Sequence, residues 1–381
     1  MSAAQTQIMA TEPKPLRVLH VSEVVLGGIA TYLDALLLWQ GRHYGRQAVA
    51  LLLPEEHVRH LSAATREAVT LLTYRRTGRN LSSFRRLLWT LRRQVLSLQP
   101  QIVHAHSSFA GFLSRMPGAV GAVPVVYTPN GWGFDREDPP LMRKLYAVAE
   151  RSIAGRAAAI VTSSEYETRV AVAAGIARER IHIIAHGIDT DRLCSETAIA
   201  EPRTGPLQLL FIGRLDPQKG FDWLLQTLEP LGPAALQLTV AGSRMLTDQD
   251  QSLKRDNIRY VGWVTQDALD GYIDACDAVI MPSRWEGFPF VVLETMRRGR
   301  PLLVSDRGAL PEMVGDGEAG LVFSLEDPGQ ARQLLKTVSR ARLEQMGRKA
   351  RAWFVENFTS EKMNQSTHRL YCSLANAQAS A

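Results

Sequence analysis

The sequence predicts an α/β protein made of two doubly wound domains that face each other across a cleft. Strand-like apolar runs alternate with helix-like stretches along most of the chain, which indicates parallel sheets covered on both faces. The 381 residues exceed what one ordinary hydrophobic core accommodates. A polar stretch with prolines and a glycine, residues 191–206, interrupts the alternation as an interdomain linker does.

The first domain is predicted to span residues 1–190. Its first strand, Leu16–Val21, is followed by Gly27-Gly28 and by a helix over Ile29–Trp39. Further short apolar runs predict strands at Gln47–Leu53, Gln101–His104, Val123–Tyr127, Ala158–Thr162 and Ile181–Ile184.

The second domain is predicted to span residues 207–355, and a helical segment, 356–381, closes the chain. Helices are expected to start near Phe221, Gln266 and Phe290. The strands are expected at Gln208–Ile212, Gln237–Ala241, Ile258–Val261, Ala278–Met281 and Pro301–Val304. Ligands of such folds bind at the carboxyl ends of the strands, so the cleft is the expected site.

The charge of the chain is unevenly distributed. The net charge is +6, and no acidic residue lies between Glu67 and Asp135. Within that interval, the stretch Leu81–Leu98 is an amphipathic helix with one apolar face, formed by Phe84, Leu88, Leu91, Val95 and Leu98. The arginines of the region Arg75–Arg93 predict contact with an anionic membrane surface. The alternative is a surface helix whose apolar face packs in the core.

The remaining composition excludes several classes of protein. No apolar run reaches the roughly 18 residues of a membrane span, and the first residues lack a secretory signal. Three distant cysteines fit neither a disulfide framework nor a zinc site. Asp189-Thr190-Asp191 is interpreted as a turn, so no metal site is predicted. We expect a cytoplasmic protein that is peripheral on the inner face of the plasma membrane.

Two cations follow the first strand of the second domain. Arg214 and Lys219 lie between Gly213 and Gly220, on a loop at the carboxyl end of Gln208–Ile212. Fixed cations bind phosphate, and glycines let the backbone approach a ligand closely. This pattern predicts a site that neutralises a departing diphosphate. The alternative is a solvated pair of cations on a turn.

Two carboxylates, Glu286 and Glu294, lie eight residues apart, the first on a loop and the second on the next helix. Carboxylates accept hydrogen bonds from sugar hydroxyls, so the pair predicts a carbohydrate site. The intervening residues are expected to line the same donor site: Gly287, Phe288, Pro289 and Phe290. The alternative is a structural salt bridge for Glu294 and a helix-start charge for Glu286.

Two features of the first domain are weaker candidates. Gly27 and Gly28 open a helix, and their amides could meet a phosphate or a sugar. The pair does not form the Gly-x-Gly-x-x-Gly pattern of dinucleotide-binding enzymes, and a plain tight turn is the alternative. His104 and His106 should point to one side of their strand, and His106 is a candidate contact for a sugar hydroxyl. A hydrogen-bonded structural histidine is the alternative.

The motifs of the second half resemble those of the family 4 retaining glycosyltransferases, which have the GT-B fold of two Rossmann-like domains. The resemblance covers most of residues 207–323. Its motifs there are Gly213–Gly220, Glu286–Glu294 and Gly299-Arg300-Pro301. In the first half the pattern is thinner and rests on Gly27-Gly28, Val103–His106 and Tyr127–Gly131.

The resemblance implies roles for single residues. Arg214 and Lys219 would bind the donor diphosphate, Glu286 would lie at the donor sugar, and these three would be the catalytic residues. Glu294 would hold the ribose, and Gly28 would approach the phosphate or the acceptor. The C-terminal helix would cross back to the first domain, which would bind the acceptor.

At two positions the chain departs from the family pattern. His186-Gly187-Ile188-Asp189 stands where Asn-Gly-Val/Ile-Asp is usual, and the second departure is at Asn130. Asn130 stands in Thr-Pro-Asn-Gly where the family often has a histidine that contacts the transferred sugar. Asparagine can also hydrogen-bond a hydroxyl, so Asn130 is a candidate sugar or acceptor contact.

The expected function is transfer of a hexose from a UDP- or GDP-sugar to an acceptor with retention of the anomeric configuration. A polyprenyl-linked saccharide of a surface polysaccharide is the expected acceptor, and no cofactor is required. The alternatives are a sugar-nucleotide epimerase and a non-catalytic sugar-nucleotide-binding protein. No nucleic-acid-binding motif accompanies the arginines, so nucleic acid is not an expected partner.

Overall fold

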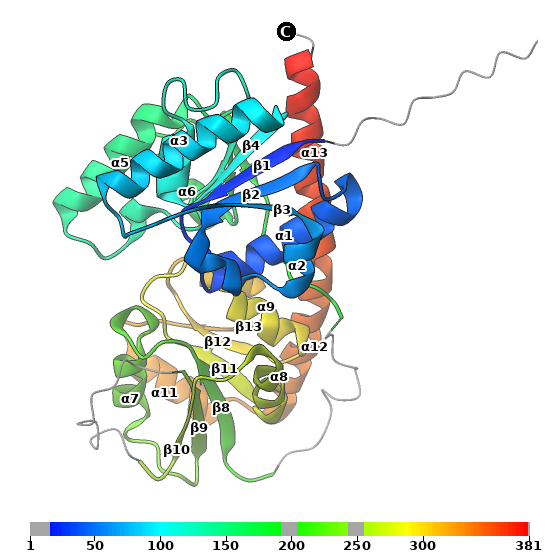
Figure 1. The fold of residues 1–381 in the computed structure, drawn as a ribbon. Helices are drawn as coiled ribbons and strands as arrows, with labels where there is room; N and C mark the ends of the chain where they lie inside the picture. Colours follow the sequence, from blue (N-terminus) through cyan, green and yellow to red (C-terminus); the bar gives the residue numbers. More distant parts are fainter. Residues whose placement is uncertain (1–15, 192–203, 243–254, 380–381) are drawn as a thin grey trace, which may run out of the picture.

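The computed structural model describes residues 16–191, 204–242 and 255–379 as two α/β domains (Figure 1). The first sheet has seven parallel strands in the order β3-β2-β1-β4-β5-β6-β7. Their bounds are β1 Val18–Ser22, β2 Val49–Pro54, β3 Thr70–Tyr74, β4 Ile102–His106, β5 Val125–Thr128, β6 Ala159–Thr162 and β7 Ile181–Ile183. The edge strand β3 was not predicted, because it is only partly buried and its sequence lacks a continuous apolar run.

The second sheet has six parallel strands in the order β10-β9-β8-β11-β12-β13. Their bounds are β8 Leu207–Ile212, β9 Leu236–Ala241, β10 Ile258–Gly262, β11 Ala278–Met281, β12 Leu302–Ser305 and β13 Gly320–Phe323. The predicted fold class, two doubly wound domains facing across a cleft, is confirmed. Most of the predicted linker, residues 192–203, lies outside the described residues.

Helices cover both faces of each sheet. In the first domain they are α1 Gly28–Tyr44, α2 Ala63–Ala68, α3 Leu81–Leu98, α4 Ser108–Ser114, α5 Pro140–Ala154 and α6 Glu165–Ala173. Those that follow are α7 Phe221–Leu228, α8 Gln266–Ala275, α9 Phe290–Arg297, α10 Leu310–Met313, α11 Pro328–Thr337, α12 Arg340–Asn357 and α13 Ser360–Ala379. Side-chain N-caps satisfy free amides at several helix starts, among them Ser62, Asn80, Ser164, Thr265 and Ser339.

The two sheets present their switch points to each other. In each sheet the chain reverses its winding direction at one strand pair, β1 with β4 in the first and β8 with β11 in the second. Gly27 and Gly28 follow β1, and Gly213 follows β8. Both switch points therefore deliver loops to the space between the domains, where ligands of such folds bind.

The last helix, α13, packs on the first domain although the chain has already built the second (Figure 1). Met363, Leu370 and Tyr371 are buried in the apolar cluster that also contains residues of α1. The Asn364 side chain donates to the Ala35 carbonyl oxygen at 3.1 Å. Burial of these apolar side chains fastens α13 to the first domain.

Helix α3 has the predicted bounds, but its apolar face does not lie on the surface. Leu87 and Leu91 are buried against the sheet, and Phe84, Leu88, Val95 and Leu98 pack beside them. The alternative stated for this helix, an apolar face that packs in the core, therefore agrees with the structure. Among the described residues no helix has the length and apolar character needed to cross a membrane.

Candidate active site between the two domains

A cavity of about 480 Å³ lies between the two domains, and we call it the cleft cavity. Loops at the carboxyl ends of β1, β8 and β11 contribute to its walls, together with α9. Ten of the twelve predicted site residues line it: Gly27, Gly28, Asn130, Arg214, Lys219, Glu286, Phe288, Pro289, Phe290 and Glu294. The other two, Gly287 and His106, are not among the lining residues.

Lys219 and Glu286 form an ion pair at the wall of the cleft cavity. The ammonium Nζ donates a short hydrogen bond to Glu286 Oε1, and Glu286 is buried. Asp216 fixes the start of this segment, because its carboxylate accepts from the Lys219 backbone N–H at 3.1 Å. The pair presents a positive group next to a carboxylate, as a site for a diphosphate and a sugar requires.

Glycine at position 220 is needed for this geometry. Gly220 has φ 66°, and a Cβ there would lie 1.9 Å from the Pro282 carbonyl oxygen. Any other residue would force the Lys219 loop away from the segment that follows β11. The two loops that carry Lys219 and Glu286 are thus held in direct contact by the backbone.

Arg214 lines the same cavity but remains accessible. Its side chain is 60% exposed and forms an ion pair with Asp216 at 3.0 Å. It also donates to the Gln218 side chain at 2.8 Å. The guanidinium is therefore held by polar neighbours at the rim of the cleft cavity, where an anion can reach it.

Glu294 is buried on the second turn of α9, which begins at Phe290 after Pro289. Its Oε1 accepts a hydrogen bond from Gln266 Nε2 at 2.7 Å. Gln266 also lines the cleft cavity. Sequence reasoning missed Gln266, because only the folded chain brings the start of α8 to α9. Together the two side chains offer acceptors and a donor to ligand hydroxyls.

An aromatic wall lies beside the polar groups of the cleft cavity. The His186 ring stacks on Phe290 with centroids 5.7 Å apart, and it meets the edge of Phe288. A Cβ on Gly28 would lie 3.0 Å from the Phe290 ring. The glycine therefore lets the start of α1 approach the second domain closely.

Glu167 was also missed, although Ser164-x-x-Glu167 has the spacing of a capping box. Its carboxylate accepts from the Ser163 N–H and hydroxyl at 2.8 and 2.7 Å. Burial raises the pKa of Glu167. A Cβ on Gly287 would lie 2.9 Å from its Oε1, so Gly287 serves a contact between the domains. Beside it, Asn130 Nδ2 is buried without a partner among the described residues.

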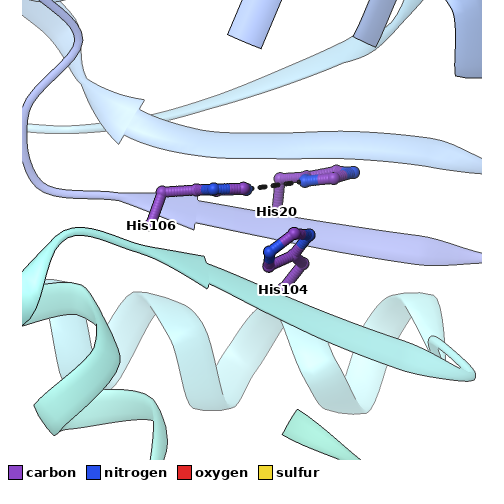
Figure 2. A group of neighbouring side chains, drawn as sticks. All are labelled: His20, His104 and His106. Atoms are coloured by element: carbon purple, nitrogen blue, oxygen red, sulfur yellow. Dashed lines mark hydrogen bonds between the residues drawn. The ribbon is translucent and has the colours of Figure 1, made fainter. Parts of the chain in front are cut away.

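His106 belongs to a buried histidine cluster formed with His20 and His104 (Figure 2). His20 Nδ1 and His106 Nε2 are 2.9 Å apart and hydrogen-bonded. His20 Nε2 is bonded to the Gln40 amide oxygen at 2.8 Å. Since His106 is completely buried, it agrees with the alternative of a structural histidine rather than with a sugar contact.

The histidine cluster has the residue types of a metal site, but its ring nitrogens are already hydrogen-bonded except for His106 Nδ1, which has no partner among the described residues. The three ligand nitrogens lie within 4.8 Å of one another. However, His104 is bonded to the hydroxyls of Thr128 and Tyr371, and both His20 nitrogens are occupied. We therefore assign the histidine cluster to the packing of the first domain and of α13.

Asp189 pairs with Arg297 at 3.2 Å, as a structural turn residue does.

Both halves of the chain match known families. Residues 26–192 match the family described as Glycosyltransferase Family 4, and residues 206–341 match Glycosyl transferases group 1. A Klebsiella pneumoniae protein, described as an uncharacterized 41.2 kDa protein in the cps region, is 28% identical over 333 residues. That match covers 84% of this chain and 89% of the Klebsiella protein.

Two further comparisons concern an enzyme and a solved structure. The UDP-Gal:alpha-D-GlcNAc-diphosphoundecaprenol alpha-1,3-galactosyltransferase of Escherichia coli is 23% identical over 246 residues, which cover 59% of this chain and 63% of the enzyme. The crystal structure of Anabaena Alr3699/HepE in complex with UDP has a TM-score of 0.75 at 18% identity, covering 94% of this chain and 100% of that one. It shares the fold. From the matched halves and the architecture, the chain belongs to the family 4 glycosyltransferases of the GT-B fold.

Proposed function

We propose that this glycosyltransferase moves a hexose from a nucleoside diphosphate sugar to a lipid-linked saccharide, with retention of the anomeric configuration, in the synthesis of a surface polysaccharide. One observation carries the donor assignment: Lys219, Glu286 and Glu294 line a single cavity at two facing switch points. Cations suit the diphosphate, and buried carboxylates suit the sugar and ribose hydroxyls.

The fold relatives support this donor class. HepE was crystallised with UDP and also with UDP and glucose. The dimensions of the cleft cavity also support it, since about 480 Å³ is the size of a typical small-molecule site. Phe288 and Phe290 add an apolar wall beside the polar groups. No metal or other cofactor is part of the proposed reaction.

In the proposed reaction the protein supplies charge stabilisation and orientation. As the sugar–phosphate bond breaks, negative charge develops on the departing diphosphate, and Lys219 and Arg214 stabilise it. Glu286 orients the donor sugar, and Glu294 orients the ribose. The departing phosphate deprotonates the incoming hydroxyl on the same face of the sugar, so no protein nucleophile is needed. Closing the cleft excludes water.

A ligand screen followed by a turnover assay tests the proposal. The first step measures thermal shifts with UDP-, GDP- and ADP-sugars, because a ligand at 100 times its Kd stabilises the native state by about 2.7 kcal/mol. The second step measures release of the free nucleoside diphosphate with and without acceptor. Release that requires an acceptor supports transfer. Conversion of the donor in the absence of acceptor, without release of the free nucleoside diphosphate, indicates an epimerase. Binding of the donor without turnover indicates a non-catalytic sensor.

The acceptor assignment rests on different support. The Escherichia coli relative is named for a diphosphoundecaprenol-linked substrate, and such a lipid resides in a membrane. In this chain the outward side of α3 carries Arg85, Arg86, Arg92 and Arg93, all exposed. Trp89 and Leu96 are exposed between them, by 63% and 80%. Arginine beside exposed tryptophan suits the interface of an anionic bilayer.

Not every arginine of the region Arg75–Arg93 is available for lipid. Arg76 and Arg79 pair with buried Glu23, each at 3.1 Å. A membrane surface is therefore proposed only for the outward side of α3.

Vesicle flotation tests this membrane surface. The wild type is expected to bind vesicles that contain anionic lipid, and the double change Arg85→Glu with Arg93→Glu is expected to weaken binding at least about tenfold, at about 1 kcal/mol per cation. Arg342→Glu with Arg348→Glu, on exposed positions of α12, is the matched control and should still bind. A wild type that stays in solution with anionic vesicles at low salt contradicts the proposal.

A further inference from the structure

Helix α6 of the first domain receives its N-terminal cap from the second domain. The Glu312 carboxylate, on α10, accepts from the backbone N–H of Glu165 at 2.7 Å and from that of Tyr166 at 2.9 Å. The next amide, that of Glu167, is satisfied within the first domain by the Ser164 hydroxyl at 3.1 Å. Two of the first three amides of α6 are thus bonded across the domain boundary.

This contact is stronger than an ordinary surface hydrogen bond. The first amides of a helix have no partner within the helix, and the helix dipole makes this end positive. A carboxylate that accepts from two such amides forms charge-assisted bonds. Because its two halves belong to different domains, the contact depends on the arrangement of the two domains seen here.

The Glu312 contact is mechanically connected to the candidate active site on both sides. On the second domain, the Ala309 N–H at the start of α10 donates to the Glu286 carbonyl oxygen at 3.1 Å. A Cβ on Gly308 would lie 2.1 Å from that same oxygen, so the two segments are packed backbone to backbone. On the first domain, the third residue of α6 is Glu167, which lines the cleft cavity.

We propose that Glu312 is a positioning residue for sugar transfer. By capping α6 it holds the two domains together, with the Glu167 side chain against the loop that carries Glu286. Glu312 itself is not among the residues that line the cleft cavity, so it acts through α6 and the Glu286 loop. The role in transfer rests on the function proposed above, whereas the closure of the domains does not.

Two substitutions of Glu312 separate this role from a general loss of stability. Glu312→Ala removes both acceptors, while Glu312→Gln keeps the shape and one acceptor but loses the charge. For Glu312→Ala we expect kcat to fall about tenfold, the value of one charge-assisted contact, and donor affinity by calorimetry to change less than about twofold. The donor-binding groups Lys219, Gln266 and Glu294 all lie on the second domain. Glu312→Gln should be intermediate.

The closure itself is measured by small-angle X-ray scattering, which needs no activity. Glu312→Ala is expected to have a larger radius of gyration than the wild type. The control is Glu229→Gln, which breaks an ion pair with Arg255 inside the second domain and should change neither kcat nor the radius.

Four outcomes are informative. An unchanged radius with unchanged kcat in Glu312→Ala overturns the proposal. If the wild type transfers no sugar but Glu312→Ala still has a larger radius of gyration, the closure contact is supported and the proposed function is rejected. A kcat loss without a larger radius overturns the closure role. If Glu312→Ala does not fold, the same comparisons are decided on Glu312→Gln.

Discussion

Replacing Lys219 by methionine is expected to lower kcat by roughly 10²–10³, the loss typical of removing one electrostatic donor from a transition state. The ammonium is held by Glu286 at the wall of the cleft cavity, at the place where the departing diphosphate would gain charge. Methionine keeps an unbranched side chain of nearly the same length and removes the ammonium group. The measurement is steady-state kcat with saturating donor and acceptor.

The control for this prediction addresses stability. Removing Lys219 leaves the buried Glu286 carboxylate without its cation, which costs on the order of 3 kcal/mol. The double change Lys219→Met with Glu286→Gln removes the unpaired charge and should restore much of the stability but not the activity. Lys349→Met breaks an exposed pair with Glu318 and should leave kcat unchanged. A folded Lys219→Met enzyme that transfers sugar within about threefold of wild type excludes Lys219 from the mechanism.

Arg214→Ala should act in the same direction with a smaller loss. The Arg214 side chain is 60% exposed, and solvent screens its charge more than that of Lys219.

The second large effect is a loss of stability in mild acid. Burial lowers the pKa of His20 to about 4 and that of His186 to about 3. Burial also holds the pKa of His104 and of His106 well below the usual range. An unfolded histidine has a pKa of about 6.5. Below that pH the unfolded chain binds protons that the native chain does not, so stability falls as the pH falls.

The expected size follows from proton linkage. Between pH 7.5 and 5.5 each buried neutral histidine removes about 1.4 kcal/mol of the free energy of unfolding, so four remove about 5.5 kcal/mol. That is a large part of the stability of an ordinary domain. Burial raises the pKa of Asp135 and of Glu167. Native proton uptake by these two carboxyls offsets part of the loss at the acid end.

Urea denaturation at pH 7.5, 6.5 and 5.5 measures this dependence. His106→Gln removes one titrating group, so its unfolding free energy should change by about 1.4 kcal/mol less over this range than that of the wild type. Gln47→Ala, at an exposed position, removes no titrating group and is the control with the wild-type dependence. A free energy of unfolding that stays constant from pH 7.5 to 5.5 contradicts the neutral, buried state of these histidines.

The sequence predicted the parts of the fold that depend on neighbouring residues. The helix starts at Phe221, Gln266 and Phe290 agree with the structure, because a turn or cap immediately precedes each apolar helix. Strand β13, Gly320–Phe323, was missed, since it is a short run beside glycines. The apolar face of α3 was visible, but its partner was not, because periodicity does not identify what a face packs against.

The same distinction holds for the site. Arg214, Lys219, Glu286 and Glu294 occur in two short motifs that have recognisable spacing, so sequence reasoning found them. Gln266, Glu167 and Glu312 act through contacts with segments far along the chain. Such partners depend on how the domains pack, and one sequence holds no local signal for that packing.

The central claim is that the cleft cavity binds a nucleoside diphosphate sugar through Lys219 and Glu294. Isothermal titration calorimetry of the nucleoside diphosphate identified in the ligand screen, into the wild type and into Glu294→Ala, tests it most directly. Loss of a buried carboxylate that bonds the ribose should weaken binding by about tenfold or more. The surface change Glu326→Ala should leave the affinity unchanged. Equal affinities of the wild type and of folded Glu294→Ala would contradict the claim.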